Sequence, residues 1–110
     1  MELRLVVAII RTHALESVEK RLQEMGVHGL TVIRARGFGA SPNLFSRDWL
    51  VDQVKIEIYL EQDRVDSIVA AILDAAHSES PGNGIVAVLP VEKVYSVSSR
   101  GEEAPNRIRS

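Results

Sequence analysis

The sequence contains two successive blocks in which a predicted strand, a predicted helix and a second predicted strand follow in the same order. Strands are identified by near-continuous apolar runs or two-residue alternation, and helices by apolar residues at three- and four-residue spacing. Strands are expected over residues 3–11, 27–36, 51–60 and 85–89, and helices over 15–25 and 63–77. The order βαββαβ predicts one small fold, whose function lies in the loops that join its parts.

The ends of the two helices carry recognisable signals. The apolar positions over 15–25 stop at Gly26, a glycine placed as helix C-termini favour. The second helix has its apolar positions over 65–76, and Asp63 is its expected N-terminal cap. The near-continuous apolar strand over 3–11 is of a kind usually covered on both faces.

Bulk properties limit the class of protein. A chain of 110 residues is one domain with a core of modest size, so that assembly would stabilise it. A formal net charge of −2 gives no general attraction to nucleic acid or anionic lipid. The absence of cysteine excludes disulfides and thiol catalysis. The strand-like start and the lack of a bilayer-length apolar run predict a cytoplasmic protein.

Two strands have charged residues on one face. Arg34 and Arg36 share a face of the second predicted strand by the two-residue period. Lys55 and Glu57 share a face of the third, and we interpret them as an interface salt bridge rather than as catalytic groups.

The irregular segments are the candidate functional loops. Residues 37–50 are too long for a tight hairpin, and long loops in compact domains are often functional. Residues 78–84 form a second loop. Pro90 is expected to interrupt the last strand, with a short edge strand over 91–97. The predicted domain covers residues 1–98, and residues 99–110 are expected to be a flexible tail.

Catalytic and metal-binding motifs are absent. The sequence has no phosphate-binding G-x-x-x-x-G-K-[ST] motif, no G-x-S-x-G and no H-E-x-x-H. The spacing of His13, His28 and His77 matches no zinc-ligand pattern. We therefore predict a protein that is not an enzyme and holds no metal.

Several short strings, in their order and spacing, resemble the PII signalling-protein family from Leu3 to about Val97. The strings are Ala8-Ile9-Ile10-Arg11, Gly26-Val27-His28-Gly29-Leu30-Thr31-Val32, Arg36-Gly37-Phe38-Gly39, Val54-Lys55-Ile56-Glu57, Ala75-Ala76, Gly82-Asn83-Gly84 and Pro90-Val91-Glu92. The resemblance implies an α+β, ferredoxin-like βαββαβ sandwich that assembles as a homotrimer. It also implies ATP or ADP in clefts between subunits, and a long loop that engages a transporter, an enzyme or a transcription regulator.

The resemblance also implies which residues bind. The ligand-binding positions would be Gly29, Thr31, Gly37, Phe38, Gly39, Gly82, Asn83, Gly84 and Arg100. The partner-binding loop would present Asn43, Leu44, Phe45, Arg47 and Trp49.

Simpler explanations remain open for several of these residues. Residues 37–39 could equally be a strand end that requires glycine conformations, and residues 81–84 an ordinary turn. Trp49 is expected to pack back onto the trimer, whereas the role of Phe45 is open between packing and partner binding.

Several residues differ from the family pattern, and these differences bear on which ligand is expected to bind and on how the protein is expected to be regulated. The loop has no tyrosine for nucleotidylylation, and Ser41 and Gln53 replace the glutamine and lysine that the family uses for 2-oxoglutarate. Ile85 stands where the family has a phosphate-binding lysine, and residues 96–98 replace its Arg-x-Arg. Each lost charged contact would weaken binding by on the order of 1.5–3 kcal/mol if buried. Arg100 lies nearby in the sequence and is the candidate to replace the missing cations.

Two hypotheses follow. In the first, a small ligand such as ATP, ADP or AMP orders the 37–50 loop of a trimeric regulator, which then docks on a partner such as a membrane transporter. In the second, the trimer is a constitutive interaction module that has lost nucleotide and 2-oxoglutarate sensing. Neither hypothesis involves nucleic acid.

Overall fold

The structure is a computed structural model that describes residues 2–37, 51–77 and 84–103. Its elements are β1 (Leu3–Arg11), the short 3-10 helix η1 (Thr12–Ala14), α1 (Leu15–Glu24), β2 (Thr31–Gly37), β3 (Val51–Glu61), α2 (Gln62–Ala76), β4 (Gly84–Val91), β5 (Tyr95–Ser96) and β6 (Gly101–Glu102). The first six long elements confirm the predicted order.

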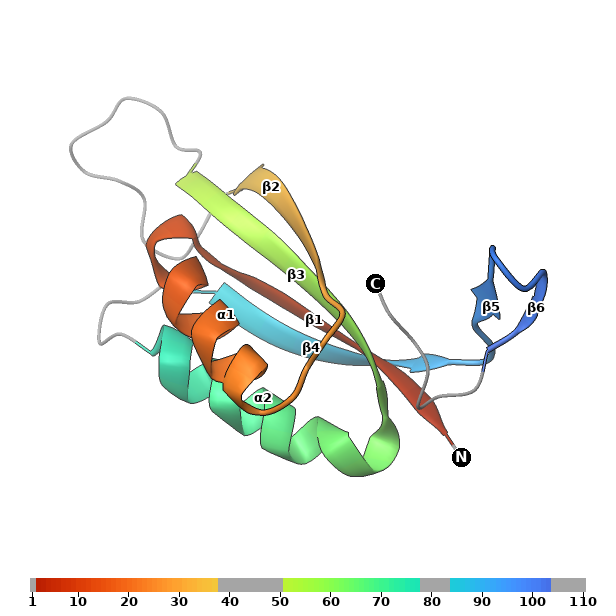
Figure 1. Cartoon of the computed structure of the whole chain (residues 1–110). Helices are drawn as coiled ribbons and strands as arrows, with labels where there is room; N and C mark the ends of the chain where they lie inside the picture. Colours follow the sequence, from red (N-terminus) through yellow and green to blue (C-terminus); the bar gives the residue numbers. More distant parts are fainter. Residues whose placement is uncertain (1, 38–50, 78–83, 104–110) are drawn as a thin grey trace.

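Four strands form one antiparallel sheet in the order β2-β3-β1-β4. The central strand β1 pairs with β3 along its whole length and with β4 from Leu3 to Ile10. Both helices cover the same face of the sheet, with α1 and α2 side by side (Figure 1). The chain therefore has an α+β fold of two layers, as the alternation of periodicities predicts.

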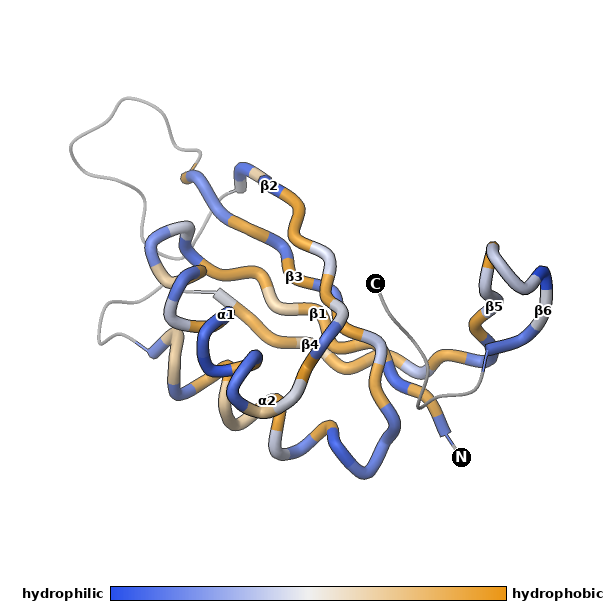
Figure 2. Tube along the Cα trace, in the orientation of Figure 1, coloured by the Kyte–Doolittle hydropathy of each residue, from blue (hydrophilic) through white to orange (hydrophobic). Residues whose placement is uncertain are grey.

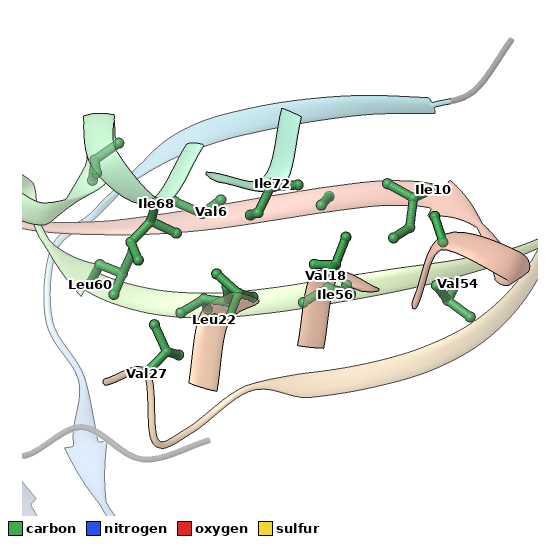
Figure 3. Packing of buried hydrophobic residues seen from close by; sticks show 14 residues of the cluster. Val6, Ile10, Val18, Leu22, Val27, Val54, Ile56, Leu60, Ile68 and Ile72 are labelled. Carbon is green, nitrogen blue, oxygen red and sulfur yellow. The ribbon is translucent and has the colours of Figure 1, made fainter. Parts of the chain in front are cut away.

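The core lies between the helices and the covered face of the sheet (Figure 3). Alternate residues of β1 and β3, among them Val6 and Ile56, point toward the helices and are fully buried. Leu22 from α1 and Ile68 from α2 meet them there. The buried faces of the strands and of both helices thus form one apolar cluster. This packing places the loops at the ends of the sheet.

The opposite face of the sheet has no layer over it among the described residues. The expectation that β1 is covered on both faces is therefore wrong within a single chain, where Leu5, Val7 and Ile9 are only half-buried. Apolar residues of the sheet are prominent along the strands in Figure 2. Lys55 and Glu57 lie on this open face, with Lys55 Nζ 3.8 Å from Glu57 Oε2. A mostly apolar sheet face with one ion pair is unusual for a surface exposed to water.

The second strand starts later than predicted, at Thr31 rather than at Val27. The predicted helix end at Gly26 is confirmed, since this residue has a φ of 81°. The Val27 N–H donates to the Leu22 carbonyl over 3.0 Å, and its side chain is 7% exposed. Val27 therefore completes the helix terminus and the core instead of joining the sheet.

The predicted cap of the second helix is also wrong. Glu61 occupies the cap position and makes no side-chain cap hydrogen bond, while Asp63 lies in the first turn. The Gln62 N–H donates instead to the Glu2 carbonyl over 2.9 Å, so the N-terminal strand satisfies one donor of the helix start. Asp63 still places negative charge where the helix dipole favours it.

Pro90 does not interrupt the last strand. It lies inside β4, opposite Arg4, and β4 is an edge strand, where the missing N–H of proline is tolerated. The chain then leaves the sheet and forms the small hairpin β5–β6 away from the body (Figure 1). The domain boundary expected at residue 98 falls inside this hairpin, and residues 104–110 lie outside the described part.

Candidate functional site

The predicted ligand-binding residues lie at the two opposite edges of the sheet. Gly37 ends β2 and Thr31 begins it, with Gly29 two residues before, so all three follow one edge. Gly84 begins β4, which is the other edge. Phe38, Gly39, Gly82 and Asn83 lie outside the described residues.

A single chain does not bring these two groups together. The strands β3 and β1 separate β2 from β4, and three strand spacings amount to about 14 Å. Gly37 and Gly84 do share one end of the sheet, because Gly37 pairs with Val51 and Gly84 with Ile10. Thr31 is six residues from Gly37, which is roughly 20 Å along a strand.

Arg100 lies farther away again. It belongs to the turn of the β5–β6 hairpin, where its φ is 60° and its N–H donates to the Ser96 carbonyl over 2.9 Å. The hairpin follows the Val91 end of β4, which pairs with Leu3, whereas Gly84 is at the other end. Within one chain, Arg100 therefore does not compensate for the cations missing beside the glycine turn.

The glycine at position 84 has a purely structural explanation. Its φ is 127°, and a Cβ at this position would lie directly against the carbonyl oxygen of Ile9. A Cβ on Gly37 would lie 2.8 Å from Gln53 Oε1, which is the end of a flexible side chain that can move. Close packing of β4 on β1 thus requires Gly84 whether or not a ligand binds there.

The predicted partner-binding residues Asn43, Leu44, Phe45, Arg47 and Trp49 all lie outside the described residues. Their roles, including the packing expected for Trp49, stay predictions.

A polar hollow of about 440 Å³ lies at the end of the sheet where β2 and β3 approach η1. It is lined by Thr12, Arg34, Ala35, Arg36, Asp52 and Gln53. Arg36 Nε is 3.4 Å from Asp52 Oδ1 across the two strands. The alternation of β2 indicates that Arg34 and Arg36 share a face, but sequence reasoning assigned them no role. The pairing of β2 with β3 and the position of η1, which bring the lining residues together, could not be predicted from that pattern.

Two other hollows lie elsewhere in the described part of the chain. An apolar one of about 160 Å³ lies between the end of α2 and the start of β4, lined by Ile72, Leu73 and Ile85 among others. The other, of about 410 Å³, has Glu2, Glu61 and Asp63 around it. No group of three or more potential metal ligands occurs within 2–37, 51–77 and 84–103. In those same segments, neither helix has the length and apolar character to cross a bilayer.

The topology and the two-edged distribution of the predicted ligand positions define a small α+β domain with one antiparallel sheet and both helices on one face. The family model described as "Nitrogen regulatory protein P-II" matches residues 3–103. The chain therefore belongs to the P-II family of nitrogen regulatory signalling proteins, which confirms the resemblance seen in its short motifs.

Individual relatives agree with this assignment. The chain is 36% identical over 108 residues to the nitrogen regulatory protein P-II of Azospirillum brasilense, covering 92% of this chain and 96% of that protein. It is 37% identical over 109 residues to the P-II homolog of Arabidopsis thaliana, covering 90% of this chain. The chain spans only 56% of the Arabidopsis homolog and 51% of the rice homolog.

A solved structure supports the same fold. The crystal structure of Arabidopsis thaliana PII bound to citrate matches with a TM-score of 0.79 and 32% sequence identity, covering 93% of this chain and 89% of that one.

Proposed function

We propose that this protein is a trimeric PII-like regulator that binds a small ligand between its subunits and controls a partner protein through the 37–50 loop. The ligand is an adenine nucleotide, ATP, ADP or AMP, and the partner is a transporter or an enzyme. The observation that carries the proposal is the location of the predicted ligand residues on both edges of one sheet. A site that needs both edges is complete only where two chains meet.

The open face of the sheet supports the trimer. The helices cover one face of the sheet, and a second chain can supply a layer for the other face. Leu5, Val7 and Ile9 run along the centre of this face beside Leu89 on β4, and Ile33 on β2 lies on the far side of Lys55. Leu89 and Ile33 are 42% and 44% exposed. An exposed apolar surface of this kind is typical of an oligomer interface. Lys55 and Glu57 would then lie inside the interface, where an ion pair can fix its register.

The two edges would form the ligand cleft. If the β2 edge of one subunit faces the β4 edge of the next, Gly37 comes close to the neighbouring Gly84 without any change inside either chain. Backbone N–H groups of glycine turns are suited to hold phosphate oxygens. The known structure with citrate concerns a relative, and it supports a small anionic ligand as the class to test first.

The protein is proposed to act by binding rather than by catalysis, in the cytoplasm and without nucleic acid. Ligand binding would order the 37–50 loop, and the ordered loop would dock on the partner.

A constitutive interaction module is the second candidate, favoured by one specific observation. Ile85, Ser96 and Ser98 stand where the family has phosphate-binding cations. In this alternative the trimer persists and the loop binds its partner without a nucleotide.

Calorimetric titration with ATP, ADP and AMP separates the two functions. The regulator is expected to bind at least one of them with a stoichiometry of one per chain, and a thermal shift should accompany binding because the ligand stabilises only the folded state. If none binds at millimolar concentration while sedimentation shows a trimer, the constitutive module is the correct function. A monomer in sedimentation would contradict both.

Val7→Asp is expected to dissociate the trimer. Val7 lies at the centre of the open face and pairs with Glu57, so an aspartate there would bury a charge beside a like charge. Sedimentation equilibrium should show monomers at concentrations where the unmodified protein is trimeric. Ala70→Asp on the exposed side of α2 is the matched control and should leave the trimer intact. Equal assembly of the two variants would contradict the proposed interface.

A further inference from the structure

The turn that leads from α1 to β2 is held by a hydrogen bond from the other helix. Arg64, in the first turn of α2, donates from Nη2 to the carbonyl oxygen of Met25 over 3.1 Å. The other hydrogen bonds of this turn are local, since the amides of Met25, Gly26 and Val27 donate to carbonyls of residues 21–23. Among the described residues, Arg64 therefore makes the one hydrogen bond that reaches the turn from another element.

Arg64 occupies a position that its own helix disfavours. It is the third residue of α2, close to the positive end of the helix dipole, where a cation is unfavourable. The carbonyl that it binds belongs to Met25 at the C-terminal end of α1, where the dipole is negative and the last carbonyls lack partners within the helix. The side chain thus stabilises the end of α1 rather than the start of α2.

A second arginine joins the same two helices in a different environment. Arg21 Nη2 of α1 is 2.6 Å from Asp74 Oδ2 of α2, and the two side chains are 43% and 71% exposed. The bond from Arg64 to Met25 is partly buried. A partly buried hydrogen bond from a charged donor stabilises more than an exposed ion pair, so the contact at the turn is the stronger of the two.

The turn determines where the β2 edge begins. Val27 is 7% exposed in the core, and β2 starts four residues later at Thr31, which pairs with Glu57 of β3. The predicted ligand position Gly29 lies between these two points, and Thr31 is the second such position. Because residues 28–30 belong to no helix or strand, the place of Gly29 depends on the turn before it and on the first strand pair after it.

We propose that Arg64 is a positioning residue for the ligand cleft, because it holds the α1–β2 turn and thereby fixes Gly29 and the start of the β2 edge. Its role is indirect and acts through the Met25 carbonyl. The inference rests on the proposed function, since Gly29 and Thr31 are ligand positions only if the cleft binds a ligand. Without the contact this wall of the cleft is less ordered, and ligand binding must then include the cost of ordering it.

The first measurement is amide hydrogen exchange of the full chain, followed by NMR, in Arg64→Met and in the matched control Arg21→Met. Each variant keeps an apolar stem but loses one positive charge and one contact between the helices. The amides of Gly26 and Val27 should exchange about 10-fold faster in Arg64→Met, as for loss of a hydrogen bond from a charged donor. In Arg21→Met they should change by less than about 3-fold, as for loss of an exposed ion pair.

The second measurement is calorimetric titration of the same proteins with ADP, at a temperature where all of them are folded. Arg64→Met is expected to weaken ADP binding by about 5-fold or more, and Arg21→Met by less than about 2-fold, because only the first disorders a wall of the cleft. A residue that merely stabilised the fold would leave the affinity of the folded protein unchanged.

The outcomes distinguish this inference from the nucleotide function. If exchange at Gly26 and Val27 is unchanged in Arg64→Met, or rises equally in Arg21→Met, then Arg64 does not hold the turn and the inference is overturned. Faster exchange with unaltered ADP affinity would overturn the positioning role, while the nucleotide function stands. If the unmodified protein binds no ADP, the positioning role toward this nucleotide fails with the site itself, and the exchange data alone decide whether Arg64 holds the turn.

Discussion

Gly84→Ala is expected to lower the free energy of unfolding by about 3–5 kcal/mol, through a strained backbone and an overlap with the neighbouring strand. The φ of 127° is one that L-residues rarely adopt, and the added Cβ would lie against the carbonyl oxygen of Ile9. That oxygen belongs to the central strand and has no room to move. Chemical denaturation followed by circular dichroism, at one fixed protein concentration because assembly shifts apparent stability, measures the loss.

Two other glycines are matched controls. Gly101→Ala meets no atom within 4 Å and should change the unfolding free energy by less than about 1 kcal/mol. Gly26→Ala also meets no atom within 4 Å, but its φ of 81° should cost about 1–2 kcal/mol. The comparison separates backbone strain from steric overlap. A Gly84→Ala variant as stable as Gly101→Ala would show that β4 does not approach β1 as closely as described.

Ile56→Ala is expected to cost about 3–4 kcal/mol, because it removes a fully buried side chain and leaves a cavity in the centre of the core. Ile56 lies on β3 beside Val18 of α1 (Figure 3), inside a buried cluster that both helices join, so relaxation of one element cannot fill the space. Leu73→Ala is the control for loss of the same kind of apolar group. Leu73 is 56% exposed on α2, and its truncation should cost less than about 1 kcal/mol. Equal losses in the two variants would contradict the position of the core.

The result for Gly84 bears directly on function. A glycine in a family motif is readily attributed to ligand binding, yet here the packing of two strands alone explains why no side chain is tolerated. The stronger functional argument comes from where Gly37 and Gly84 lie, at the same end of the sheet but on opposite edges. That arrangement requires a neighbouring chain before the two glycines can share a ligand.

The distribution of positively charged residues also bears on ligand binding. Positions 85, 96 and 98 have no cations, while Arg34 and Arg36 lie beside a hollow on the other edge. Titration with nucleotides therefore asks whether ligand recognition is retained in this chain or has been lost.

The order of elements, the amphipathic faces and the end of the first helix were determined by the sequence alone. They depend on periodicity and on local conformational preference, which neighbouring residues suffice to specify, and Gly26 with its φ of 81° is the clearest case. The family could also be recognised, because its short motifs occur in the right order along the chain.

Contacts between distant segments were decided only by the tertiary structure. Val27 fills the core instead of joining β2, the Glu2 carbonyl accepts the bond from the start of α2, and Pro90 stays in a strand because β4 is an edge. The pairing of Arg36 with Asp52 across β2 and β3 belongs to the same group of facts. Sequence periodicity specifies which face a residue occupies, but only the packing of elements specifies what lies opposite that face.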